Sequence, residues 1–149
     1  MQQLLLHLAG DYLLQSDHMG AKKRTSTFWA GFHALVYALP FLLLLQPSWA
    51  AWSVICGSHL IIDRFGLARY VVWAKNIVLG LWPERLLCRL GGSAARVEKW
   101  QEDRRRLAWR NCTLTGYPAD VPPWLAGTLI IVADNTLHLA INWASLTWL

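Results

Sequence analysis

Apolar residues in this chain are concentrated in four segments that polar connections separate. The segments cover residues 3–15, 28–45, 50–62 with room to continue, and 124 to about 146. Only the second and the fourth approach the roughly 20 residues that a helix needs to cross a bilayer upright. The first and the third are therefore predicted to be short spans, re-entrant pieces or helices extended by neighbouring residues.

The basic residues predict how these segments are oriented. Every Lys and Arg lies in one of three places: Lys22 to Arg24 between the first two segments, Arg64 to Lys75 after the third, and 85–110 before the fourth. The turn "QPSWA" between the second and third segments has none. Because basic loops stay in the cytoplasm, four crossings predict both termini outside and the basic connections inside a bacterial inner membrane.

Two stretches between the third and fourth segments are predicted to stay outside the bilayer core. Residues 65–82 are apolar with isolated basic side chains, which favours a helix that lies in the headgroup region. Residues 84–123 are polar and predict a basic cytoplasmic loop, within which "VEKWQEDRRRLAWR" is typical of a solvated helix. The prolines of "GYPADVPPW" then end that helix before the fourth segment.

Composition supports an all-α integral membrane protein with one domain over residues 1–149. Of the 149 residues, 55% are hydrophobic and ten are tryptophan. Both contents are higher than in an ordinary soluble domain. In a soluble protein, the net charge of +5 would suggest nucleic-acid binding. Here the predicted membrane topology already explains the positions of the basic residues. We therefore predict membrane lipids as partners, with anionic headgroups near the basic loop, and no specific nucleic acid. Three scattered cysteines predict neither a disulfide framework nor a zinc knuckle.

Ionisable residues inside the apolar segments carry the candidate chemistry. Four of five histidines and three of six aspartates lie there, and six of these seven form pairs at spacing four, which places both partners on one helix face. Chance would supply about 0.4 such pairs. The pairs are His7 with Asp11, His59 with Asp63, and Asp134 with His138, while His33 stands alone.

Burial of three aspartates in a bilayer demands a partner. An ionised aspartate near the bilayer centre costs about 2.5 to 3.5 kcal/mol on insertion scales, and these segment cores contain no Lys or Arg. Imidazole and carboxylate are ligands for zinc, manganese or iron. We predict one or two divalent ions, zinc first, with manganese or iron as alternatives. The predicted metal ligands are His7, Asp11, His33, His59, Asp63, Asp134 and His138.

The topology predicts that most of these residues share one depth, the cytoplasmic half of the membrane, whereas Asp134 lies deeper unless its segment starts below the surface. Two other readings of the set stay open, a hydrogen-bond network without metal and a proton or ion pathway. The surrounding polar residues are weaker candidates. A phosphate near the mouth of the site could be attracted by Lys22, Lys23 and Arg24. A helix cap or turn is the expected role of Asp17 and His18. Hydrogen bonds to the ligands are expected from Gln15, Asn135 and Asn142.

The ordered combination of these motifs resembles a family of small bacterial and phage integral-membrane proteins of unknown function. The pattern H-x-x-x-D-[YF]-x-x-Q, then H, H-x-x-x-D and D-x-x-x-H matches "HLAGDYLLQ", His33, "HLIID" and "DNTLH". This resemblance covers the chain from end to end apart from the cytoplasmic loop. A more distant likeness is to membrane-bound metal-dependent hydrolases, and it implies hydrolysis.

The function predicted from these observations is metal-dependent hydrolysis of a lipid or lipid-linked phosphoester, reached from the cytoplasmic side. The ion would acidify a bound water, and Asp11 and His33 are the predicted catalytic residues. One alternative is ion or proton transport through the same site. Another is a phage or bacterial membrane modulator that has a structural metal and a loop for a host protein.

Overall fold

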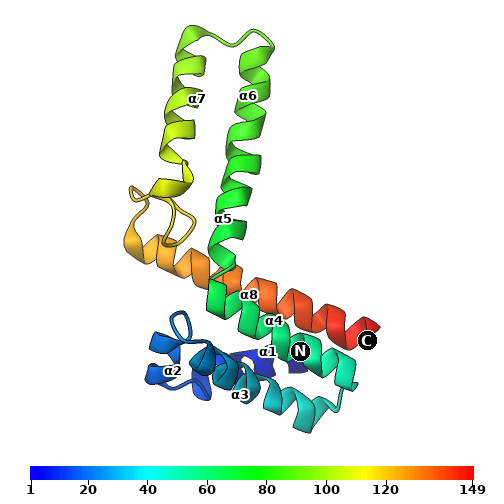
Figure 1. Ribbon diagram of the computed structural model, residues 1–149. Coiled ribbons are helices and arrows are strands. Elements are labelled where there is room, and N and C mark those ends of the chain that lie inside the picture. The colour runs from blue at the N-terminus through cyan, green and yellow to red at the C-terminus, as the bar shows by residue number, and fades with distance from the viewer. The chain divides into compact units, whose positions relative to one another are not determined.

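The computed structural model describes residues 1–149 as helices joined by turns and loops, with no strands (Figure 1). The predicted all-α class is confirmed. The chain divides into two compact units: unit 1 consists of Met1–Leu67 and Asp134–Leu149, and unit 2 consists of Ala68–Ala133.

Unit 1 contains the helices that the apolar segments predicted. Serine side chains begin three of these helices, because Ser16, Ser26 and Ser48 each accept a hydrogen bond from the backbone N–H three residues later, at 3.3, 3.5 and 3.0 Å. Gly66 ends the helix that contains His59 and has a φ of 59°, a left-handed conformation that glycine adopts without strain. The elements are α1 (Gln2–Leu8), η1 (Ala9–Leu13), α2 (Asp17–Lys22), α3 (Thr27–Leu45), α4 (Trp49–Phe65) and, from Asp134, the second part of α8 (Pro123–Trp148).

The apolar core of unit 1 is built around α3. Tyr37, Ala38 and Phe41 of α3 are fully buried and pack with Ile55 of α4 and Leu6 of α1. Small side chains on α3 allow neighbouring helices to approach it closely. A short distance along the same helix, His33 is also completely buried, so the polar group described below is contiguous with the apolar core.

Two helices, α3 and α8, are long and apolar enough to cross a membrane. The twelve residues of α1 and η1 extend only about 18 Å at 1.5 Å per residue, and α4 has 17 residues. The predicted helices are therefore present in all four segments, whereas a bundle with four crossings is a finer prediction that length and composition do not establish.

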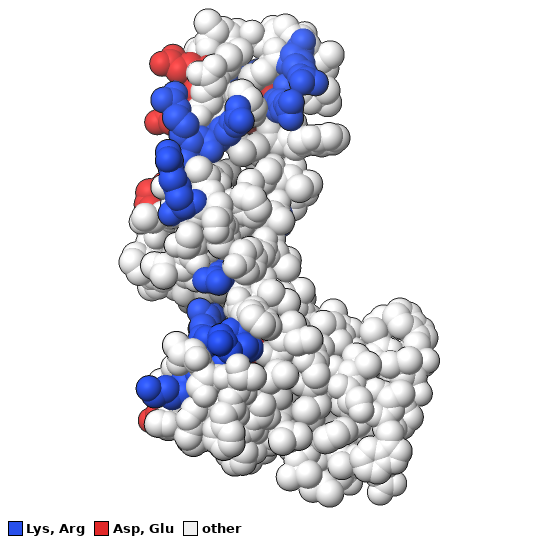
Figure 2. Space-filling view, viewed as in Figure 1, with Lys and Arg blue, Asp and Glu red and all other residues white.

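Unit 2 consists of α5 (Ala68–Asn76), η2 (Ile77–Leu81), α6 (Trp82–Arg89), α7 (Ala94–Arg106), η3 (Trp109–Asn111) and the first part of α8. The helix predicted over residues 65–82 is present, and α6 continues it to Arg89 with Pro83 in its first turn. Within residues 84–123, predicted as a loop with one helix, that helix is present as α7, and it forms a helical hairpin with α6 that turns at Gly91. Ten of the fourteen Lys and Arg residues belong to unit 2, and Figure 2 shows many of them on this hairpin.

Candidate metal centre

Unit 1 contains all seven predicted ligands and gathers six of them into two groups. Side-chain atoms of Asp11, His33, His59 and Asp63 lie within 4.8 Å of one another in the first group. The second group consists of Asp63, Asp134 and His138 by the same measure. Four separate elements supply these residues: η1 supplies Asp11, α3 supplies His33, α4 supplies His59 and Asp63, and α8 supplies the rest.

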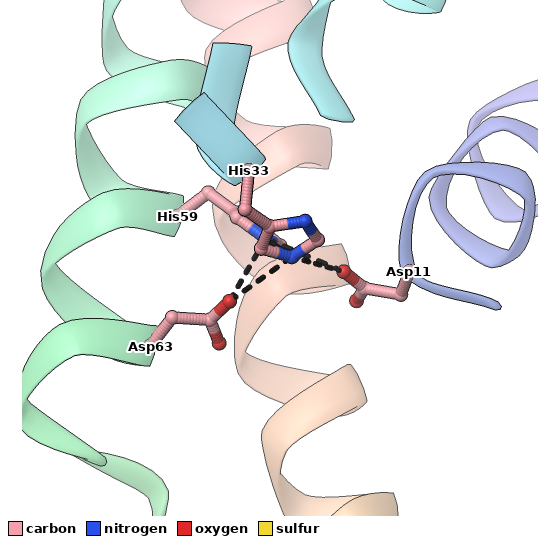
Figure 3. A group of neighbouring side chains, drawn as sticks. All are labelled: Asp11, His33, His59 and Asp63. Carbon is pink, nitrogen blue, oxygen red and sulfur yellow. Dashed lines mark hydrogen bonds and ion pairs between the residues drawn. The ribbon is translucent and has the colours of Figure 1, made fainter. Parts of the chain in front are cut away.

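In the first group, four potential ligand atoms converge on one point (Figure 3). The Nε2 atom of His33 lies 3.3 Å from Asp11 Oδ1 and 3.2 Å from Asp63 Oδ2. The Nε2 atom of His59 has the same two separations, 3.3 and 3.2 Å. The two Nε2 atoms are 3.0 Å apart. Five of the six separations among the four atoms therefore fall within a few tenths of an ångström of one another.

The five separations match the edges of a coordination tetrahedron, and the sixth, between the two carboxylate oxygens, is at most 4.8 Å. The centre of a regular tetrahedron with edges of about 3.2 Å lies about 2 Å from each corner, and zinc binds imidazole nitrogen and carboxylate oxygen at roughly 2.0 to 2.2 Å. The two carboxylates would also neutralise a divalent cation. The buried group of Asp and His residues could therefore hold a metal ion without a large movement of any side chain.

A network without metal would satisfy these atoms poorly. All four side chains are at least nine-tenths buried, so water is largely excluded. Asp11 Oδ1 accepts no hydrogen bond, since its separations from the imidazole nitrogens qualify as ion pairs but lack hydrogen-bond geometry. Asp63 Oδ2 likewise accepts none from the imidazoles, and its other partner is the ammonium group of Lys23. The two Nε2 atoms can share only one proton between them. A cation at the centre would contact all four atoms at once, which favours metal over the dry network.

The local structure around Asp11 explains how its carboxylate reaches this point. Asp11 lies in η1, a π-helix that follows α1 directly, and the wider π turn changes the direction of side chains relative to a continuous α-helix. Gly10 allows η1 to approach α3, because a Cβ atom at this position would lie 2.5 Å from Cδ2 of Tyr37. The i, i+4 spacing of His7 and Asp11 did not predict this π-helix.

Tyr37 orients the ligands and was missed by the sequence analysis. Its ring stacks on the imidazole of His59, with centroids 3.7 Å apart and planes inclined by 15°. Its hydroxyl accepts a hydrogen bond from Nδ2 of Asn142 at 2.6 Å and lies 2.8 Å from Nδ1 of His7. The signal that could have identified Tyr37 is its spacing of four from His33, and Asn142 likewise follows His138 by four.

The second group shares Asp63 with the first. Nε2 of His138 lies 3.6 Å from Asp63 Oδ1 and 3.6 Å from Asp134 Oδ2. The carboxylate of Asp63 therefore directs one oxygen to each group. The imidazole of His138 is buried, and its Nε2 atom has no hydrogen-bond partner. The Asp134 side chain is 27% exposed, in contrast to the 9% or less of every other group member.

One lysine from the basic connection reaches the centre. Nζ of Lys23 lies 2.9 Å from Asp63 Oδ2, and the side chain is 19% exposed. The ammonium group thus joins the same carboxylate oxygen that belongs to the first group. A positive charge at the partly exposed edge of the site suits an anion that approaches a bound metal ion.

Comparison with known proteins places the chain in a family. Residues 1–78, just over half of the 149 residues, match the family described as "Protein of unknown function (DUF3307)". The chain belongs to this family. No curated protein and no solved structure matches it.

The part of the chain that matches DUF3307 contains the whole first group, together with Lys23 and Tyr37. The motif of Asp134 and His138 lies outside the matched residues, so the resemblance that the sequence analysis extended to the end of the chain is shown only for residues 1–78.

The remaining candidates lie beside the two groups or apart from them. His7 belongs to neither group, and its Nδ1 atom faces Tyr37 and, at 3.5 Å, Asp11 Oδ2. His18 is exposed and stacks edge-on against Trp29. Asn135 pairs with the hydroxyl of Tyr12 at 3.0 Å. Of the three predicted hydrogen bonders, Asn142 thus has the most direct link to the ligands, through Tyr37.

Proposed function

We propose that this protein is an integral membrane protein that binds a divalent metal ion at Asp11, His33, His59 and Asp63 and hydrolyses a lipid or lipid-linked phosphoester from the cytoplasmic side. The observation that carries the proposal is the convergence of two imidazole nitrogens and two carboxylate oxygens in a buried interior, where five of their six separations are 3.0 to 3.3 Å. Zinc is the first choice for the ion, with manganese and iron as alternatives.

The exposed surface of the long helices supports the membrane assignment. The apolar windows of α3 and α8 are only 33% and 11% buried, so most of their side chains need an apolar environment that the chain itself does not provide. Phe28, Leu35 and Leu43 of α3 are each more than half exposed. Acyl chains would cover such surfaces. The basic residues of the α6–α7 hairpin would lie among anionic headgroups at the cytoplasmic face.

A phosphoester suits the charges at the site. When bound, metal in this cluster of Asp and His residues would polarise a phosphoryl oxygen and lower the pKa of a water molecule. Asp11 and His33, as ligands, would hold the ion in position, and in this sense they are the proposed catalytic residues. Lys23 would exchange its ion pair with Asp63 for one with the phosphate, because the ion then occupies that carboxylate.

With a phosphomonoester as substrate, the reaction consumes one water molecule. Its oxygen forms a bond to phosphorus, and the bond between phosphorus and the lipid oxygen breaks. One proton of the water is transferred to the leaving oxygen, so the products are an alcohol and inorganic phosphate. No oxidant, reductant or second substrate is required.

Metal analysis and a phosphatase assay on the full chain in detergent test the proposal. We expect His59→Ala to lower the affinity for metal at Asp11, His33 and Asp63 at least about tenfold and phosphate release at least about a hundredfold, with phosphatidic acid and a polyprenyl phosphate in mixed micelles as probes. His18→Ala is the matched control, because this histidine is exposed and lies outside both groups. Unchanged metal in His59→Ala would refute the metal site, and metal-loaded wild-type protein that releases no phosphate from either probe would refute the hydrolase assignment.

One observation favours a second candidate function. Four protein ligands with little exposure are typical of structural zinc, which suits a membrane modulator whose metal only stabilises the fold. In that case, removal of the ion with a chelator would lower the thermal unfolding temperature, while the loaded protein would release no phosphate from either probe.

A further inference from the structure

The carboxylate of Asp63 joins two groups of potential ligands. We infer that a second divalent metal ion binds Asp63, Asp134 and His138, so that Asp63 bridges two ions and the second ion is the one that takes water and the substrate phosphate. This inference rests on the proposed metal site of the first group.

The orientation of Asp63 is the first argument for a bridge. Its Oδ2 atom lies 3.2 Å from the imidazole nitrogens of His33 and His59, and its Oδ1 atom lies 3.6 Å from Nε2 of His138. A carboxylate that directs each oxygen to a different set of imidazoles can bind two ions at once. Paired ions in hydrolytic enzymes are roughly 3.5 to 4 Å apart, a spacing that a bridging carboxylate spans.

His138 is the second argument. The side chain is 1% exposed, and its Nε2 atom has no hydrogen-bond partner although two carboxylates lie nearby. Bond lengths of about 2.1 Å in a tetrahedral site require ligand atoms about 3.4 Å apart. The two separations of 3.6 Å from Nε2 to Asp63 Oδ1 and Asp134 Oδ2 therefore need to close by only about 0.2 Å.

Charge supplies the third argument and identifies the ligand class. The three carboxylates would contribute three negative charges and Lys23 one positive charge, so one divalent ion would leave the site without a net charge to attract a phosphate. A second ion would make the site positive. Only the two-ion form therefore attracts a phosphomonoester dianion strongly.

Accessibility distinguishes the roles of the two ions. The first group supplies four protein ligands and is closed, whereas the second supplies three and leaves a coordination position open, as catalytic sites do. Asp134 is also the most exposed side chain in either group, at 27%. The second ion would thus bind water and phosphate, and the first would fix Asp63 in position.

Manganese binding to the stripped full chain in detergent tests the inference. We expect two Mn²⁺ per wild-type chain, with the electron paramagnetic resonance spectrum of a coupled pair. His138→Ala and Asp134→Asn should each bind one Mn²⁺ and lose the coupling, while the exposed-site variants His18→Ala and Asp17→Asn should keep two. Inorganic phosphate should bind at least tenfold more tightly to the wild-type protein than to His138→Ala.

The outcomes separate this inference from the proposed function. If the wild-type protein binds a single ion and His59→Ala loses it, the second site is overturned and the first stays intact. If His138→Ala still binds two ions, the second ion lies elsewhere, and the inference is overturned as well. No ion in the wild-type protein refutes the proposed function itself. If His138→Ala does not fold, the wild-type spectrum decides, because two uncoupled Mn²⁺ signals would overturn the bridge and a coupled pair would support it.

Discussion

Replacement of Tyr37 by phenylalanine tests how the candidate site is held together. Tyr37 is completely buried, and its hydroxyl joins Asn142 and His7, which are also buried. Phenylalanine keeps the ring that stacks on His59 but removes the hydroxyl. The variant therefore separates the hydrogen-bond network from the aromatic packing.

The structure sets the size of the expected effect. A buried polar group that loses its partner costs about 1 to 3 kcal/mol, and Tyr37→Phe leaves two such groups, Nδ2 of Asn142 and Nδ1 of His7. Allowing for some relaxation, we expect the free energy of unfolding to fall by about 2 to 4 kcal/mol. The metal content at saturation should equal that of the wild type, because none of the ligands in the first group has changed.

Unfolding in mixed micelles with increasing dodecyl sulfate, followed by circular dichroism, measures this change. Tyr12→Phe is the matched control, since the Tyr12 hydroxyl is exposed and pairs with Asn135, and it should cost under about 0.5 kcal/mol. Adding Asn142→Leu to Tyr37→Phe removes both partners of one bond, so the double variant should be more stable than the sum of the single effects by about 1 to 2 kcal/mol. A loss below about 0.5 kcal/mol for Tyr37→Phe, or strict additivity, would refute the reasoning.

Three further predictions follow from neighbouring features. Gly10→Ala should lower the free energy of unfolding by about 1 to 3 kcal/mol and weaken metal binding, as measured by thermal melts and metal titration, because its Cβ would clash with Tyr37. Lys23→Met should tighten metal binding but weaken phosphate binding to the loaded protein, since the ammonium group pairs with a carboxylate oxygen of Asp63; the same change in both affinities would contradict this role. Acidification from pH 7 to 5 should release the metal, because imidazoles must be neutral to ligate, and metal content that is constant over this range would argue against histidine ligands.

The hydrophobic pattern predicted the helices better than it predicted their limits. All four apolar segments are helical, and the all-α class follows from them. The pattern did not predict the π-helix at Ala9–Leu13, because one wide turn changes the register without changing composition. It also predicted a helix where α7 lies but not the continuation of α6 to Arg89, and it therefore missed the hairpin. A segment rich in charged residues can still be helical when its polar side chains face water.

The sequence by itself determined which side chains share a helix face, since spacing four brings both members of a pair to one side of an α-helix. Only the tertiary structure decided which atoms meet. The carboxylate of Asp11 belongs to a group with His33 and His59 and not with His7, its partner at spacing four. The carboxylate of Asp63 belongs to both groups. The rotation and depth of each helix depend on packing against its neighbours, and the close approach at Gly10 and the stacking of Tyr37 are contacts between helices that no local spacing encodes.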